Sequence, residues 1–160
     1  MTDRRLVILR HAKSAWPEDV PDHERPLAER GERDAPVAGR WLAEHIGVID
    51  VALCSPATRA RQTWTLAAGE LASTPDTRYD ERIYGASPGD LLDVVQGIED
   101  DVGTAVLIGH NPGLSHLVTA LAGERHELKT SSIAVLTWPG EWTDAGSAPA
   151  TLADVAKPRG

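Results

Sequence analysis

The sequence has little cysteine and no long apolar run. It contains one cysteine, Cys54, and apolar stretches such as Leu6–Leu9 soon give way to charged residues. A single cysteine has no partner within the chain, so a disulfide framework is excluded. A signal peptide needs an apolar stretch of about 7–15 residues and a membrane-spanning helix needs about 20, and the chain has neither. We therefore expect a cytoplasmic protein with no membrane partner.

The sequence also has few basic residues relative to acidic ones. The 160 residues include 16 Lys and Arg against 24 Asp and Glu, which gives a net charge of −8. Proteins that bind nucleic acid or anionic membranes through charge are usually basic, so the composition argues against both kinds of partner. An anionic ligand of this protein has to be held by a local group of cationic residues. The length favours one domain over residues 1–160.

Apolar runs alternate with segments of helical spacing. Continuous apolar runs are typical of strands that are buried on both faces of a parallel sheet. They predict strands at Arg4–Arg10, Ile49–Cys54, Thr104–Gly109, Ile133–Trp138 and Thr151–Ala156. Strands that alternate with helices predict an α/β domain with a largely parallel central sheet and helices on both faces, a three-layer αβα sandwich.

Proline marks the predicted start of three helices. Ser55-Pro56, Ser87-Pro88 and Asn111-Pro112 each place a capping residue directly before a proline, which favours the first helical position. We expect a helix to begin at each pair. The segment Gly140–Pro149 predicts a flexible turn region, and we expect the last few residues of the chain to be frayed.

Polar residues follow three of the predicted strands. Arg10 and His11 close the first strand, Arg59 lies in the first helical turn after the second, and His110 and Asn111 close the third. Ligands of open α/β sheets bind at the carboxyl ends of the strands, where helix N-termini also present free N–H groups. Arginine, histidine and helix N-termini together predict a phosphate site at this edge.

Each of these residues has a plainer interpretation when it is taken alone. Arg10-His11 is compatible with a surface turn, Arg59 with a solvated charge and His110 with a helix cap, and only their conjunction favours one anion site. No spacing typical of a zinc site occurs, so we expect neither a metal nor another cofactor. The spacing between Cys54 and Arg59 does not fit a cysteine-dependent phosphatase.

Three motifs resemble those of the histidine phosphatase superfamily, which has the phosphoglycerate-mutase-like fold. They occur in the family's order over Leu6–Trp138, and they are Leu-Arg10-His11-Ala-Lys-Ser, Ser55-Pro-Ala-Thr-Arg59-Ala-Arg-Gln62-Thr63 and Gly109-His110-Asn111-Pro. The first motif and the segment from Glu24 to Gly31 are similar to the small SixA-type phosphohistidine phosphatases. The resemblance implies the sandwich fold, and the short connection between Arg59 and Thr104 predicts that it has no cap domain.

The resemblance also implies a role for each matching residue. His11 would be the nucleophile that forms a phosphohistidine intermediate, and Arg10, Arg59 and His110 would hold the phosphoryl oxygens. Glu81 lies in a segment similar to the one that supplies the proton donor in mutase relatives. It is either the catalytic acid or a solvated charge at a strand end.

Further residues are expected around the phosphate. Arg25 belongs to the Arg-Pro-Leu segment of the subfamily and is expected to bind phosphate, as are Lys13 and Asn111, whereas Ser14 is either a contact or an ordinary loop residue. Neighbouring arginines should lower the pKa of His11 and favour the neutral imidazole that attacks phosphorus.

The substrate class follows from the shortness of one connection. The stretch between Arg59 and Thr104 is predicted to hold two helices and a short connector, which leaves no insert for a lid. An open site admits a phosphorylated side chain of another protein, so we expect a phosphohistidine protein as substrate and inorganic phosphate as product. The alternatives are a general phosphomonoesterase on small phosphate esters and a catalytically silent phosphate-binding module.

Overall fold

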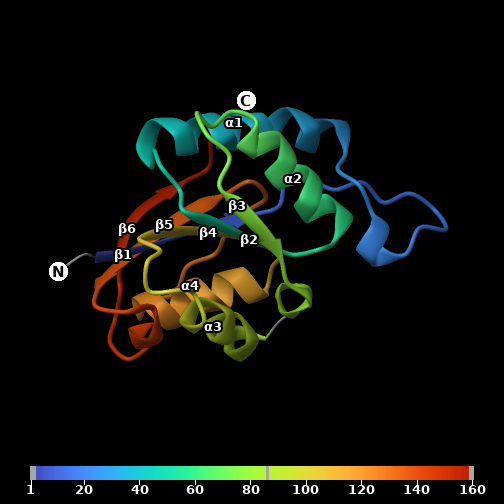
Figure 1. The fold of residues 1–160 in the computed structure, drawn as a ribbon. Coiled ribbons are helices and arrows are strands. Elements are labelled where there is room, and N and C mark those ends of the chain that lie inside the picture. The colour runs from blue at the N-terminus through green and yellow to red at the C-terminus, as the bar shows by residue number, and fades with distance from the viewer. Residues whose placement is uncertain (1–2, 86, 159–160) are drawn as a thin grey trace.

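A single six-stranded sheet organises the computed structural model, which describes residues 3–85 and 87–158 (Figure 1). Its strands are β1 (Asp3–Arg10), β2 (Val51–Cys54), β3 (Asp76–Tyr79), β4 (Thr104–Gly109), β5 (Ile133–Pro139) and β6 (Thr151–Ala156). In the order β3-β2-β4-β1-β5-β6, the first four strands are parallel, β5 is antiparallel to β1, and β6 is antiparallel to β5. The prediction of a largely parallel sheet is confirmed.

Two helices cover each face of this sheet. The helices are α1 (Glu29–His45), α2 (Thr58–Ala68), α3 (Pro88–Gln96) and α4 (Gly113–Ala122), with short 3-10 helices at Asp22–Glu24, Glu81–Ile83 and Trp142–Asp144. Helices α1 and α2 lie on one face and α3 and α4 on the other (Figure 1). The three-layer αβα sandwich is therefore confirmed, and no cap domain interrupts the described part of the chain.

The alternation of side chains along β1 explains why its apolar run is continuous. Leu6 and Ile8 pack in the core beneath α3 and α4, whereas Val7 and Leu9 pack in the core beneath α1 and α2. All four side chains are fully buried. Since each such side chain contributes about 1.5–3 kcal/mol on burial, both faces of this strand stabilise the sandwich.

Strand β3 was not predicted from the sequence. Its residues Asp76–Tyr79 are polar and mostly exposed, because β3 lies at the edge of the sheet and pairs only with β2. An edge strand with solvent on its outer side carries no apolar run, so the sequence predicts only a connector between helices at this place.

Of the three predicted helix starts, only the one at Ser87 is correct. The Ser87 hydroxyl accepts a hydrogen bond from the Asp90 backbone, and the Asp90 carboxylate completes a capping box. Helix α2 begins at Thr58 rather than at Pro56, because the Ser55 hydroxyl accepts from the Ala57 backbone N–H (3.2 Å) within a turn that precedes the helix.

Helix α4 also begins later than predicted. It starts at Gly113, so Pro112 is the residue before the helix and does not occupy the first helical position. Asn111 still satisfies a helix donor, since its Oδ1 accepts from the Ser115 backbone N–H (3.0 Å). The predicted start is therefore wrong by one residue: Pro112 occupies the cap position and Asn111 lies directly before it.

The predicted turn region Gly140–Pro149 contains the third 3-10 helix. Trp142 is fully buried there, and its Nε1 donates to the Val102 carbonyl at 2.7 Å. Residues 159–160, where frayed residues were expected, lie outside the described part of the chain. Across the ranges 3–85 and 87–158, none of the helices combines the length and apolar character required to cross a bilayer.

Candidate active site

The two histidines meet because β1 and β4 are adjacent and parallel. Arg10 is paired with Gly109 at the ends of these strands, so the next residues, His11 and His110, follow at the same edge. The His11 backbone N–H donates to the Gly109 carbonyl at 3.0 Å, and the two imidazole centroids lie 5.2 Å apart. The expected juxtaposition at the carboxyl edge of the sheet is therefore present.

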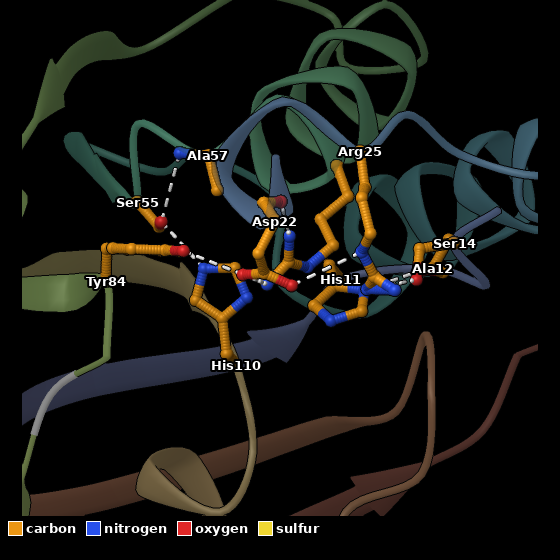
Figure 2. Close-up of polar contacts among 10 residues, drawn as sticks. His11, Ala12, Ser14, Asp22, Arg25, Ser55, Ala57, Tyr84 and His110 are labelled. Carbon is orange, nitrogen blue, oxygen red and sulfur yellow. Dashed lines mark hydrogen bonds and ion pairs between the residues drawn. The ribbon is translucent and has the colours of Figure 1, made fainter. Parts of the chain in front are cut away.

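The His11 imidazole is buried and held in one orientation. Its Nδ1 lies 2.7 Å from the Ala12 carbonyl oxygen (Figure 2). A carbonyl only accepts, so Nδ1 carries the hydrogen and Nε2 presents its lone pair. Burial of this ring, which is 7% exposed, is the main cause that lowers the pKa of His11 to about 4, and Arg10 and the other arginines of the site lower it further. The imidazole is neutral at pH 7.

Three arginines surround this ring with hydrogen-bond donors. Arg10 donates NH1 to the Leu128 carbonyl (3.1 Å), and Arg59 donates to the backbone carbonyl and carboxylate of Asp22 (2.7 and 3.0 Å). Within the described residues, the buried side-chain nitrogens without a hydrogen-bond partner are Arg10 Nε, Arg25 Nε and NH1, Arg59 Nε and His110 Nδ1. Unpaired buried donors cost free energy, so their concentration at one place indicates a site for an oxyanion.

Asp22 is a member of the site that the sequence analysis missed. Its Oδ2 accepts from the Tyr84 hydroxyl at 2.7 Å and from Arg59 at 3.0 Å, and its Oδ1 lies 3.3 Å from Arg25 Nε (Figure 2). The Tyr84 hydrogen bond, followed by those from Arg59, lowers the pKa of this carboxyl group. The carboxylate thus neutralises part of the arginine charge, on a loop that carried no motif for it.

His110 is connected to the end of β2. Its Nε2 lies 2.7 Å from the Ser55 hydroxyl, and Tyr84 approaches its ring edge-on with centroids 5.7 Å apart. Burial, followed by the charges of His11 and Arg59, lowers the pKa of His110 to about 3. His110 is therefore also neutral at pH 7, and Ser55 orients it instead of capping a helix.

The remainder of the second motif fixes the loop that follows His11. Thr63 Oγ1 accepts from the Ala12 backbone N–H (2.9 Å) and donates to the Arg59 carbonyl (2.7 Å). Gly31 approaches the same loop so closely that a Cβ there would lie 2.1 Å from the Lys13 carbonyl oxygen. Helix α1, through the close approach of Gly31, and helix α2, through the Thr63 side chain, therefore both contact the backbone of the loop that follows His11.

The remaining predicted residues lie at different distances from this centre. Ser14 is buried and accepts from Arg25 at 3.0 Å, whereas the Lys13 side chain is exposed. The Asn111 amide is occupied, since its Nδ2 donates to the Leu128 carbonyl at 2.6 Å in addition to its bond in α4. The Glu81 side chain is 77% exposed. The roles of Lys13, Asn111 and Glu81 stay predictions.

Cys54 lies beside the site but is not placed for chemistry. It is buried, and burial raises the pKa of its thiol to about 12, so the reactive thiolate is absent at neutral pH. In the part of the chain that the structure describes, no three His, Cys, Asp or Glu side chains are grouped so as to hold a metal ion.

Comparison with a protein family agrees with this arrangement. A family model described as the histidine phosphatase superfamily (branch 1) matches residues 6–102. The matched range contains His11 and Arg59 and ends before His110, which the sheet brings to the same place.

Individual relatives extend the likeness over the whole chain. An uncharacterized protein of Mycobacterium tuberculosis is 42% identical over 165 residues, covering 94% of this chain and all of the relative (100%). A structure from Nakamurella multipartitia, described as a candidate phosphohistidine phosphatase SixA, has a TM-score of 0.89 at 30% identity, over 99% of this chain and 98% of that one. A similarly described structure from Agrobacterium tumefaciens has a TM-score of 0.84 at 28% identity, over 97% and 98%.

Proposed function

This chain belongs to the histidine phosphatase superfamily, and we propose that it hydrolyses phosphohistidine on proteins through a covalent phosphohistidine intermediate on His11. The unpaired buried donors around His11 carry this proposal. They belong to Arg10, Arg25, Arg59 and His110, and they surround a neutral imidazole whose Nε2 is free to attack. Three positively charged side chains with buried nitrogens that have no hydrogen-bond partner suit the anionic oxygens of a transferring phosphoryl group better than a neutral ligand.

In the first step, His11 Nε2 attacks the phosphorus and the bond between phosphorus and the substrate nitrogen breaks. The electron pair of that bond stays on the substrate imidazole, which takes up one proton from the predicted donor Glu81. The arginines stabilise the charge on the phosphoryl oxygens, because buried nitrogens of Arg10, Arg25 and Arg59 have no hydrogen-bond partner in the protein. The Ala12 carbonyl stabilises the positive His11 ring that forms, since Nδ1–H already donates to it.

In the second step, water attacks the phosphorus and gives one proton to the Glu81 carboxylate, while His11 leaves as a neutral imidazole and inorganic phosphate is released. The low pKa of His11 makes it a good leaving group at pH 7. When the Ser55 hydroxyl donates to Nε2 of His110, the hydrogen of the neutral His110 ring lies on Nδ1, which then donates to a phosphoryl oxygen. We assign no proton donor beyond the predicted Glu81.

The absence of a cap over the site in the described residues supports a protein substrate. No cap domain is present in the described residues, so a side chain projecting from another protein has access to His11. The two structural relatives at 30% and 28% identity are themselves described as candidate phosphohistidine phosphatases. We also propose that the protein acts without a metal cofactor and in the cytoplasm.

A phosphatase assay tests these assignments. Phosphate release is measured from a histidine-phosphorylated protein and from p-nitrophenyl phosphate, with a metal chelator present throughout. We expect the wild type to prefer the phosphohistidine protein, and His11→Ala to lose at least about a thousandfold in rate, because the covalent step is removed. His116→Ala, which alters an exposed histidine on α4, is the matched control.

Each result has a distinct meaning. Faster turnover of p-nitrophenyl phosphate than of the protein would favour a general phosphomonoesterase, and loss of activity in chelator would overturn metal independence. Phosphate binding without any turnover would indicate a silent binding module. A phosphoryl label that is stable to alkali, labile to acid and absent from His11→Ala would identify the intermediate directly.

A further inference from the structure

Trp16 lies on the loop that follows His11 and is 75% exposed, more than any other large hydrophobic side chain of the described residues. Its ring is not simply in solvent. The guanidinium carbon of Arg25 lies 3.3 Å from the centroid of the indole, so the two planar groups are in contact. A cation over an indole face is attracted by the negative face of the ring.

The covered guanidinium has donors left over. Arg25 is 6% exposed, and its Nη2 donates to the Ser14 hydroxyl, while Nη1 is buried without a hydrogen-bond partner and Nε, also without one, lies in an ion pair 3.3 Å from Asp22 Oδ1. A guanidinium donates in its own plane, so a ring on its face covers it without using any N–H group. Trp16 therefore shields Arg25 and leaves its free donors available.

The contact between Arg25 and Asp22, by contrast, is one that a bound phosphoryl group would disturb. Asp22 also binds Arg59 and Tyr84, and an incoming phosphoryl group competes with that carboxylate for both arginines. Burial lowers the pKa of Arg25, and repulsion by the like charge of Arg59 lowers it further. The stack on Trp16 is a contact that phosphate binding does not have to replace.

We propose that Trp16 is a positioning residue for phosphate recognition, which holds the Arg25 guanidinium in the orientation that binds the phosphoryl oxygens. This inference rests on the proposed phosphatase function. The indole does not take part in bond making. It reduces the side-chain freedom that Arg25 would otherwise lose on each binding event, so its effect falls on affinity rather than on the chemical step.

The test compares Trp16→Ala with Trp16→Phe. We measure the inhibition constant of inorganic phosphate, and KM and kcat with p-nitrophenyl phosphate. In Trp16→Ala we expect the inhibition constant and KM to rise roughly tenfold with kcat changed by less than about twofold. Trp16→Phe should restore wild-type constants to within about threefold, because a phenyl face also attracts a cation.

Two controls separate positioning from a general effect of truncation. Val48→Ala shortens another exposed hydrophobic side chain, one that is 73% exposed, and should leave every constant unchanged. In an Arg25→Ala background, Trp16→Ala should have no further effect, since its target is gone. Thermal melting checks that each variant is folded, which we expect because Trp16 is outside the core.

The outcomes distinguish this inference from the proposed function. A wild type that neither turns over phosphate esters nor binds inorganic phosphate would overturn both. An active wild type with unchanged constants in Trp16→Ala would overturn the inference alone. The same would follow if Trp16→Ala weakened phosphate binding equally with and without Arg25, because the indole would then act on something else.

Discussion

The two ends of β1 each carry a buried or half-buried arginine, and the two side chains differ in how many of their nitrogens have a hydrogen-bond partner. Arg4 lies at the N-terminal end and is 8% exposed, and Arg10 lies at the C-terminal end beside His11. Every side-chain nitrogen of Arg4 has a partner at 2.6–2.9 Å: the carbonyls of Gly140, Asp100 and Val102 and the carboxylate of Glu141. A charge that is satisfied in this way is part of the fold.

Among the described residues, the Arg10 side chain makes one hydrogen bond, from Nη1 to the Leu128 carbonyl, and its Nε is buried without a partner. Burial lowers the pKa of this guanidinium, so the protein holds the charge there at a cost. Arg25 and Arg59 show the same incomplete pairing. In this molecule, an arginine that binds a ligand differs from a structural arginine in having N–H groups without a hydrogen-bond partner, and not in how deeply it is buried.

The comparison is tested most severely by replacing Arg10. In Arg10→Met we expect kcat/KM to fall about a thousandfold, because one of the phosphoryl-binding charges is lost, while the free energy of unfolding stays within about 1 kcal/mol of the wild type. The Leu128 carbonyl remains satisfied, since Asn111 Nδ2 also donates to it at 2.6 Å. Steady-state kinetics and urea denaturation measure the two quantities.

Arg33→Met is the control for this change, because it removes the same charge from an exposed position on α1 and should alter neither quantity. A large loss of stability in Arg10→Met with little change in kcat/KM would make Arg10 a structural residue. The distinction between the two ends of β1 would then be wrong.

The converse change is expected at the other end of the strand. Arg4→Met should lower the free energy of unfolding by about 3 kcal/mol, because it leaves the Gly140 and Asp100 carbonyls without their donor and breaks the pair with Glu141. Its kcat/KM should stay within about threefold of the wild type. Urea denaturation gives the first value, and a parallel loss of activity in the folded protein would contradict the assignment.

Acid should weaken the end of the sheet that carries the site. The folded-state pKa values of His11 and His110, about 4 and 3, lie below the ordinary value near 6.5. The unfolded chain therefore takes up protons first as the pH falls, so the stability is complete above about pH 6.5 and is lost progressively below it. Between pH 7 and 5.5 we expect a loss of about 2 kcal/mol, about 1 from each histidine.

Urea denaturation at the two pH values measures this loss. His11→Asn and His110→Gln should each remove about half of it, because neither new side chain titrates. The carboxyl group of Asp22, whose pKa is lowered, loses its contribution only at more acidic pH and does not affect this window. Equal pH dependence in wild type and both variants would show that the two rings are not the groups responsible.

The predictable parts of the fold are those where one physical signal acts alone. The apolar runs of β1 and β4 predict buried strands because both faces of each are covered, and Ser87 predicts a cap because its bonds are local. Strand β3 gave no such signal, since its pairing with β2 alone leaves its polar side chains exposed. Helix α2 begins late because the Ser55 hydroxyl accepts from Ala57 in a turn and also contacts His110, a tertiary partner that no local rule includes.

The candidate site divides in the same way. His11 and His110 could be placed together from the sequence, because parallel neighbouring strands end at one edge. Asp22 and Tyr84 could not, because their hydrogen bond joins two loops that have no periodic pattern. The cause of the low pKa of His11 was also only partly anticipated: the arginines contribute as expected, but burial is the larger cause and depends on packing that only the fold reveals.

The smallest expected effect is the response of stability to inorganic phosphate. An anion that occupies the unpaired donors binds the folded state alone, so at about ten times its Kd it should stabilise by about 1.4 kcal/mol and raise Tm by about 3–5 °C, relative to sodium chloride at equal ionic strength. Arg4→Met should keep this increment from its lower starting Tm, because its partners are all within the protein, and Arg10→Met should lose most of it. An undiminished increment in Arg10→Met would place the anion elsewhere, and the unpaired donors at this end of β1 would then need another explanation.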